Sequence, residues 1–167
     1  LIRRLAAAGR MSDADINAES AKDRTDVGLR KAAAASAARP DPAAKEAAWN
    51  RLVDAETPLA MQKALIRGLQ ERDQEELFAP FLDRWVAMVP RYWLERSSEE
   101  AEFFTAGMYP VYRVDDGVVA AADRLLEGGE LKESGRRLVL ESRDQTLRLQ
   151  RAQAADQASE AEVGVGT

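Results

Sequence analysis

The sequence contains no histidine and no cysteine. Without an imidazole or a thiolate, the chain cannot assemble a His or Cys zinc site, a Ser-His-Asp or Cys-His nucleophile pair, or a histidine general base. We therefore expect no catalytic residue, no metal site and no cofactor within this chain. The absence of cysteine also excludes structural disulfides and fits a reducing compartment, so we expect a cytoplasmic protein.

The sequence also lacks an excess of positive charge and lacks long apolar runs. Its 24 Lys and Arg residues stand against 29 Asp and Glu residues, which gives a net charge of -5. A nucleic-acid partner would require a basic face, and this balance argues against one. No run of about 18 consecutive apolar residues is present, the length that a membrane-spanning helix needs. We expect neither nucleic acid nor a membrane as a partner.

Strand-forming residues are scarce. The chain has 11 Val and 3 Ile, whereas Ala, the best helix former, occurs 31 times. This usage predicts an all-α fold. A chain of 167 residues is one domain by its length. A domain of this size buries roughly 70% of the surface that its unfolded chain exposes, so its core needs neither metal nor disulfides.

The expected helices begin at Asp, Ser or Thr residues that can cap them, in two places with Pro at the first helical position. The predicted helices cover residues 1–9, 13–21, 23–38, 41–55, 57–70, 73–85, 98–109, 115–127 and 131–155. Acidic pairs fall at three of these starts, where capping and the helix dipole account for them without any catalytic role. These pairs are Asp13 with Asp15, Glu99 with Glu100, and Asp115 with Asp116.

The widest apolar surface falls on the helix that starts near residue 73. Phe81, Trp85 and Tyr92 recur along it at helical spacing, and Trp93 belongs to an adjacent stripe. Such a surface belongs to an inner, heavily buried helix. Pro90 interrupts the pattern, and we predict a kinked helix there, with a new helix starting at Pro90 as the alternative. The residues expected in the structural core are Trp49, Phe81, Trp85, Tyr92 and Trp93.

The helix starts recur along the chain. Every second helix begins roughly 34 to 40 residues after its counterpart, which is within the range of helix-pair repeats. We predict about eight to nine helices in antiparallel pairs, forming a curved α-solenoid of the HEAT or armadillo kind over residues 1–155. A closed helical bundle is the alternative. Residues 156–167 have no apolar period and no caps, and we predict a disordered tail there.

Arginine is the residue type whose placement could carry recognition. Arg84, Arg91 and Arg96 flank the aromatic helix, and guanidinium groups on a concave face would bind carboxylates such as a peptide C-terminus. Arg91 and Arg96 are the candidate contacts for such a peptide carboxylate. Ion pairing on exposed helix surfaces is the alternative, and we favour it for the arginines as a group because such pairs are common.

Two motifs are more specific than this general pattern. Residues 23–28 read D-x-T-x-x-G, and residues 40–49 read P-D-x-x-x-K-x-x-x-W. Further on come Met108-Tyr109-Pro110 and an arginine-rich closing helix. In order and spacing, over about residues 1–155, they resemble the C-terminal helical domain of zinc aminopeptidases of the aminopeptidase N family, in its actinobacterial form. This is the domain type also found in endoplasmic-reticulum aminopeptidases.

The resemblance implies an α-solenoid that caps a separate catalytic domain of the same polypeptide and walls the cavity that holds the peptide substrate. The zinc would lie in that catalytic domain, because the family's H-E-x-x-H motif and its G-x-M-E-N motif are both absent here. No catalytic role carries over to a residue of this chain. The start at Leu1 without an initiator Met makes us expect a fragment of a larger protein. A free-standing helical-repeat scaffold that binds a protein partner in its groove is the alternative function.

Overall fold

The computed structural model describes the backbone of residues 1–164 and the side chains of residues 1–159. Within this part, the chain forms ten α-helices and no strand. The helices are α1 (Ile2–Ala7), α2 (Asp13–Lys22), α3 (Asp26–Ala38), α4 (Pro42–Val53), α5 (Leu59–Leu69), α6 (Glu75–Phe78), α7 (Phe81–Glu95), α8 (Ser98–Gly107), α9 (Asp116–Glu127) and α10 (Glu133–Gly164). The all-α prediction is confirmed, with more helices than the eight to nine expected.

Side-chain caps explain where several helices start. A side-chain oxygen accepts a hydrogen bond from a backbone N–H of the first turn, which has no partner inside the helix. The residues that do so are Ser12 for α2, Thr25 for α3, Asp41 for α4, Ser97 for α8 and Asp115 for α9. Three caps differ from those predicted. The cap of α3 is Thr25 rather than Asp23, and the cap of α8 is Ser97 rather than Ser98. Thr57 does not cap α5, whose N-cap position is held by Pro58 without a side-chain hydrogen bond.

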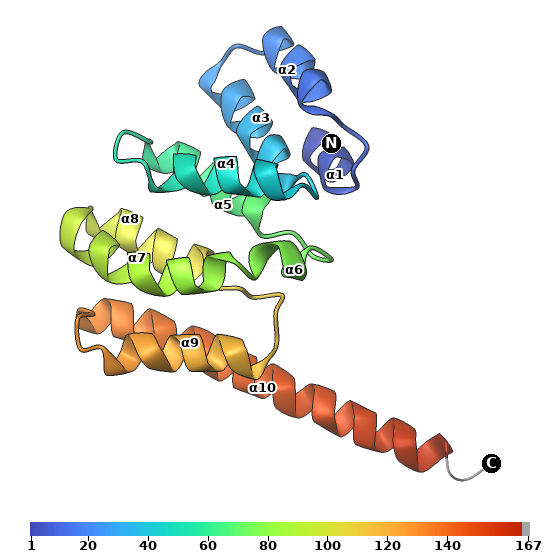
Figure 1. The fold of residues 1–167 in the computed structure, drawn as a ribbon, viewed down its shortest axis with the longest axis vertical. Coiled ribbons are helices and arrows are strands. Elements are labelled where there is room, and N and C mark those ends of the chain that lie inside the picture. Colours follow the sequence, from blue (N-terminus) through green and yellow to red (C-terminus); the bar gives the residue numbers. More distant parts are fainter. Residues whose placement is uncertain (165–167) are drawn as a thin grey trace.

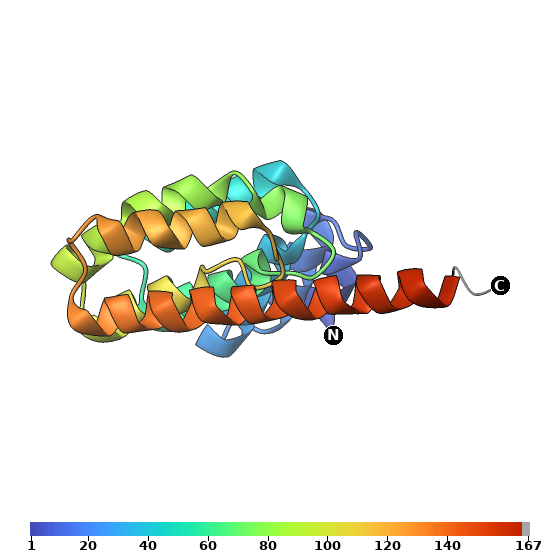
Figure 2. The same cartoon turned by 90° about the horizontal axis from the view of Figure 1, so that it is seen from below.

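Most of the helices lie in pairs that follow one another along the molecule. Figure 1 shows α4 with α5, α7 with α8, and α9 with α10 in succession, while α1, α2 and α3 form the N-terminal end. Figure 2 shows that α9 and α10 lie in separate layers. Contacts between α5 and α8 and between α8 and α10 connect one layer from pair to pair, and α7 packs on α9 in the other.

The main core is a cluster that extends from α3 to α10, and a second, smaller cluster joins Ala6 of α1, Ile16 of α2 and Ala35 of α3. The structure buries all five predicted core residues, and Trp85 is 0% exposed. Tyr92 stacks on Phe104 with ring centroids 3.9 Å apart. Burial raises the pKa of the Tyr92 hydroxyl to about 12. The indole N–H groups of Trp85 and Trp93 both donate to Thr105, to its carbonyl oxygen and its hydroxyl respectively. The polar atoms that these rings carry into the core are therefore paired.

The structure interrupts the aromatic helix at Pro80, a break that the sequence analysis did not predict. The helix expected to start near residue 73 is divided into α6 and α7, and the break falls at Ala79 and Pro80. Pro90 lies inside α7, which continues through it to Glu95. Pro80 interrupts the helix because it has no N–H to donate, and it stands at a site where α7 can begin. Pro90 also lacks an N–H and so removes one backbone hydrogen bond from α7. The buried apolar side chains on both sides of Pro90 hold the helix together.

The C-terminal helix is longer than predicted. α10 continues to Gly164, so the disordered tail expected from residue 156 is wrong for residues 156–164. Residues 165–167 lie outside the described part of the chain. The prediction assumed that a helix needs an apolar face. Once a helix has started, however, Ala, Gln and Glu can continue it without packing against another element. Figure 1 shows this end of α10 projecting beyond the other helices.

A helix that spans a membrane must be both long and apolar, and the helices of the described part can be judged by these two properties. None of them is both long enough and apolar enough to cross a bilayer.

Candidate functional site

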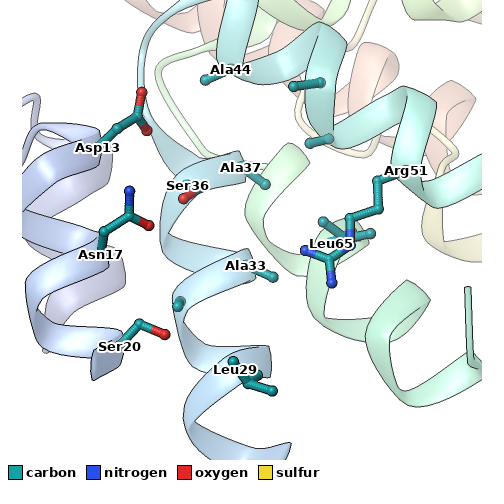
Figure 3. Close-up of a pocket in the computed structure, with 13 residues that line it drawn as sticks. Asp13, Asn17, Ser20, Leu29, Ala33, Ser36, Ala37, Ala44, Arg51 and Leu65 are labelled. Atoms are coloured by element: carbon teal, nitrogen blue, oxygen red, sulfur yellow. The ribbon is translucent and has the colours of Figure 1, made fainter. Parts of the chain in front are cut away.

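A groove lies between α2, α3 and α4, and Figure 3 shows the side chains that line it. Its volume is about 430 Å³, within the range of sites that hold small molecules or short peptide segments. We call it the α2–α3–α4 groove. Its lining residues are Asp13, Asn17, Ser20, Leu29, Ala32, Ala33, Ser36, Ala37, Ala44, Ala47, Ala48, Arg51 and Leu65.

The floor of the groove consists mainly of alanine. Ala33 and Ala37 come from α3, and Ala44 and Ala48 come from α4. An alanine side chain ends at Cβ, so two helices with facing alanines leave space above them that longer side chains would fill. The alanine content that makes these segments good helix formers therefore also creates the groove.

The rim of the groove is polar. Asp13, Asn17 and Ser20 lie along α2, and Arg51 extends from α4 on the other side (Figure 3). The Asp13 carboxylate pairs with the guanidinium of Arg39, which joins the start of α2 to the end of α3. Arg51 forms no ion pair with any described residue. The groove therefore combines an apolar floor with hydrogen-bonding groups at its edges, an arrangement suited to an extended peptide.

The D-x-T-x-x-G motif builds the start of α3. The Asp23 carboxylate accepts a hydrogen bond from the Thr25 hydroxyl at 2.5 Å, and the Thr25 hydroxyl oxygen accepts one from the Gly28 N–H at 3.2 Å. The Thr25 hydroxyl and the Thr25 backbone N–H both donate to the Asp23 carboxylate and hold its pKa below the usual value. A Cβ on Gly28 would lie 2.0 Å from the Asp23 carbonyl oxygen, so this position requires glycine. The motif is a capping device that sets one wall of the groove.

The P-D-x-x-x-K-x-x-x-W motif builds α4. Asp41 caps the helix at the Ala43 N–H, and Trp49 stacks on Phe81 with centroids 5.2 Å apart. Lys45 is 1% exposed, and its Nζ donates to the carbonyl oxygens of Ala37 and Gly68 at 2.7 and 3.2 Å. Those carbonyls belong to the last turns of α3 and α5, which have no partners inside their helices. Lys45 therefore joins three helices at one point.

Both motifs therefore have structural roles, and the sequence as a whole is similar to known proteins. Residues 1–148 match the ERAP1-like C-terminal domain. The chain belongs to this family. It is also 41% identical over 159 residues to a protein named Aminopeptidase N from Streptomyces lividans, which covers 95% of this chain. The match spans 19% of that relative, so the chain corresponds to about a fifth of its length.

The described part of the chain was predicted to hold no metal site. No group of three or more His, Cys, Asp or Glu side chains lies close enough there to hold a metal ion. The whole sequence also lacks imidazole and thiolate. Some of the acidic residues noted in the sequence cap helices, whereas others, such as Asp13 with Arg39, pair with side chains of other elements. For example, the Glu100 carboxylate accepts from the Ser97 hydroxyl and backbone N–H in a capping box, and these bonds lower its pKa.

The two predicted carboxylate contacts lie at one end of α7, away from the α2–α3–α4 groove. The Arg96 guanidinium donates to the carbonyl oxygens of Ala55 and Val53 at 2.8 and 3.0 Å, which caps the end of α4. The exposed Arg91 pairs with Glu95 one turn later, with Nε to Oε1 at 3.3 Å. The structure thus gives each arginine a partner inside the domain. A contact with a peptide carboxylate stays a prediction for both.

The groove itself was missed in the sequence, although a signal for it exists. The alanines of α3 and α4 were noted only as helix formers, and which of them face open space depends on how the helices cross. Arg51 was not singled out in the sequence. Ala47 and Ala55 occupy its i-4 and i+4 positions, and Asp54 at i+3, which is the C-cap of α4, forms no ion pair with it in the structure. An arginine without a helical partner is a candidate for a contact elsewhere.

Proposed function

We propose that this chain is the non-catalytic C-terminal domain of a zinc aminopeptidase, which we call the parent aminopeptidase. In this proposal the domain caps the catalytic domain and walls the cavity that holds a peptide substrate. One observation carries it: an ERAP1-like C-terminal domain match that coincides with 41% identity to an Aminopeptidase N. The zinc would be held outside this chain, because the chain has neither histidine nor cysteine to bind it.

The helix pairs support a solenoid architecture in this role. Successive pairs contact mainly their neighbours, as in repeat proteins, where each unit packs on the next and the stack offers an extended surface. Such a stack grows along one axis, as the succession of α4/α5, α7/α8 and α9/α10 does in Figure 1. A surface of this kind is suited to covering one side of another domain.

A cavity wall must also be stiff, and the helix crossings supply this property. A Cβ on Gly68 of α5 would lie 2.3 Å from the carbonyl oxygen of Ala34 in α3. A Cβ on Gly135 of α10 would lie 2.8 Å from the indole ring of Trp93 in α7. Both glycines allow a closer approach than any other residue would. Helices packed this closely have little freedom to move relative to each other.

We assign the peptide contact to the α2–α3–α4 groove. Its alanine floor admits small side chains and a main chain, while Asn17, Ser20 and Ser36 offer hydrogen bonds to peptide groups. Arg51 supplies a cation for an acidic side chain or a terminal carboxylate. Only a peptide of several residues would reach both the groove and a catalytic centre in another domain.

The test fills the groove in the parent aminopeptidase. Ala47 lines the groove and is exposed, and Ala120 is exposed on α9, away from it. We expect Ala47→Trp to raise KM for long peptides and to leave a single-residue aminoacyl reporter unaffected, because only the long peptide occupies the groove. Ala120→Trp is the matched control and should change neither. Equal kinetics of the two variants on long peptides would refute the assignment.

Removal of the whole domain tests the cap. Deleting the segment corresponding to residues 1–167 should leave zinc bound and impair turnover of long peptides more than of the reporter, because enclosure orients a peptide and excludes water. Full turnover of long peptides by the folded remainder would contradict the capping role. The free-standing scaffold is the weaker alternative, since the relative carries this domain within a longer polypeptide.

A further inference from the structure

A second groove lies between α1, α3 and α5, on another face of α3. Its volume is about 360 Å³. Alanines of α3 and α5 contribute to its lining, together with the half-exposed Val27. Its charge distinguishes it: the described lining includes five cationic side chains and no acidic one. The five are Arg3, Arg30, Lys31, Lys63 and Arg67. We call it the basic groove.

The five cations of the basic groove differ in whether they form ion pairs within the described part of the chain. Arg3 pairs with Glu71, and Lys63 pairs with Glu99 at 3.0 Å. Arg30, Lys31 and Arg67 form no ion pair with any residue of the described part. They project from two neighbouring helices toward one groove, where like charges repel each other.

The clustering of these cations in one groove sets them apart within this chain. Its net charge is -5, and other arginines are matched across helices: Arg84 with Glu46, Arg124 with Asp83 and Arg143 with Asp123. Two acids lie near these cations, because the charge of Lys31 helps to lower the pKa of the Asp23 carboxyl and Asp26 precedes Arg30 by one helical turn, yet neither acid forms an ion pair with them. Grouped positive charge in a concave site attracts carboxylates from elsewhere. The three cations therefore remain available to a carboxylate from outside the domain.

We infer that the basic groove docks a carboxylate-bearing segment of the same polypeptide that lies outside residues 1–167. The argument for this occupant is charge complementarity together with length, because this chain corresponds to only a fifth of its Aminopeptidase N relative. A tethered segment meets the groove at an effective concentration of about millimolar, which a free ligand seldom reaches. The inference rests on the proposed function in one respect: the chain must be part of a longer polypeptide.

Zero-length carbodiimide cross-linking of the full-length parent aminopeptidase tests this docking. The reagent joins a lysine amine to a carboxylate in contact with it, and Lys31 and Lys63 both line the groove. We expect mass spectrometry to find Lys31 or Lys63 joined to an Asp or Glu outside residues 1–167, with a yield that dilution does not change. Lys63 with Glu99 is the positive control, and the buried Lys45 is the negative one.

Two double variants make the test specific. Arg30→Gln with Arg67→Gln keeps both lysines and removes two free charges, and it should lower the yield about tenfold if each charge contributes about 0.7 kcal/mol. Arg137→Gln with Arg148→Gln removes two exposed charges of α10 and should leave the yield unchanged. Absence of the external cross-link while Lys63–Glu99 forms would overturn the inference. So would cross-links only to an added acidic peptide, or only between copies. None of these results would alter the outcome of the groove-filling kinetics.

Discussion

The ammonium group of Lys45 lies 2.7 Å from the carbonyl oxygen of Ala37, in the last turn of α3. The same Nζ also reaches the carbonyl oxygens of Gly68 and Leu69 at the end of α5. A cation at the C-terminal ends of two helices neutralises their partial negative charge and satisfies their unpaired carbonyls. One side chain of α4 therefore fixes the positions of α3 and α5, two of the helices that form the grooves.

Replacing this lysine should strongly destabilise the fold. Lys45→Met keeps most of the side-chain volume and removes the donor from three buried carbonyls. We expect a loss of about 2–4 kcal/mol in the free energy of unfolding, measured by urea denaturation. Lys31→Met is the control, because Lys31 is exposed, and it should change stability by less than about 0.5 kcal/mol. A Lys45→Met variant as stable as the control would show that the carbonyls find other partners.

The same lysine should make stability depend on pH. Burial lowers the pKa of Lys45 from 10.5 to about 8. Between these values the unfolded state holds a proton that the folded state has lost, so unfolding takes up a proton and stability rises with pH. The cost of the buried charge is fully present below about pH 8, and up to about 3 kcal/mol is recovered by pH 10.5. The stability difference between wild type and Lys45→Met should widen across this window, and a constant difference would contradict the lowered pKa.

The fold was predictable where local chemistry decides it. Asp41 and Asp115 cap helices through hydrogen bonds to residues two or three positions away, so the sequence pattern alone indicates them. The role of Lys45 was not predictable. Its partners stand 8, 23 and 24 residues away, and only the packing of α3 against α5 brings them together. The grooves escaped prediction for the same reason.

Trp85 should be among the most sensitive positions in the core. It is 0% exposed, and its indole packs edge-to-face on Tyr109 with centroids 5.5 Å apart. Trp85→Ala should cost about 3–5 kcal/mol, because it removes a large buried side chain and leaves a cavity. Leu94 belongs to the same helix and is 84% exposed, so Leu94→Ala should cost less than about 0.5 kcal/mol. Urea denaturation of both variants checks the contrast, which similar losses would contradict.

The end of α10 should be dispensable for stability. The side chains of residues 151–159 are all exposed, so this part of the helix buries nothing against the domain. Truncation after Ala155 should therefore leave the thermal midpoint nearly unchanged, while the helical circular-dichroism signal decreases by the residues removed. A large fall in the midpoint would mean that this segment packs against another part of the protein.

Arg91 and Arg96 should separate into a recognition role and a structural role. Arg96→Ala removes two hydrogen bonds to the end of α4 and a guanidinium that lies 5.4 Å from the centre of the Tyr92 ring, so we expect a stability loss of about 1–2 kcal/mol. Arg91→Ala removes only an exposed pair with Glu95 and should cost less than about 0.5 kcal/mol.

Arg91 is therefore the variant that tests peptide recognition without disturbing the fold. If it contacts a C-terminal carboxylate, Arg91→Ala in the parent aminopeptidase should raise KM for free-acid peptides up to about fivefold, the effect of one exposed ion pair. The C-terminal amides of the same peptides lack that charge and should keep their KM. Arg124→Ala is the matched control, because Arg124 is exposed and pairs with Asp83 on another helix. Equal effects of Arg91→Ala on acids and amides would exclude Arg91 as a carboxylate contact.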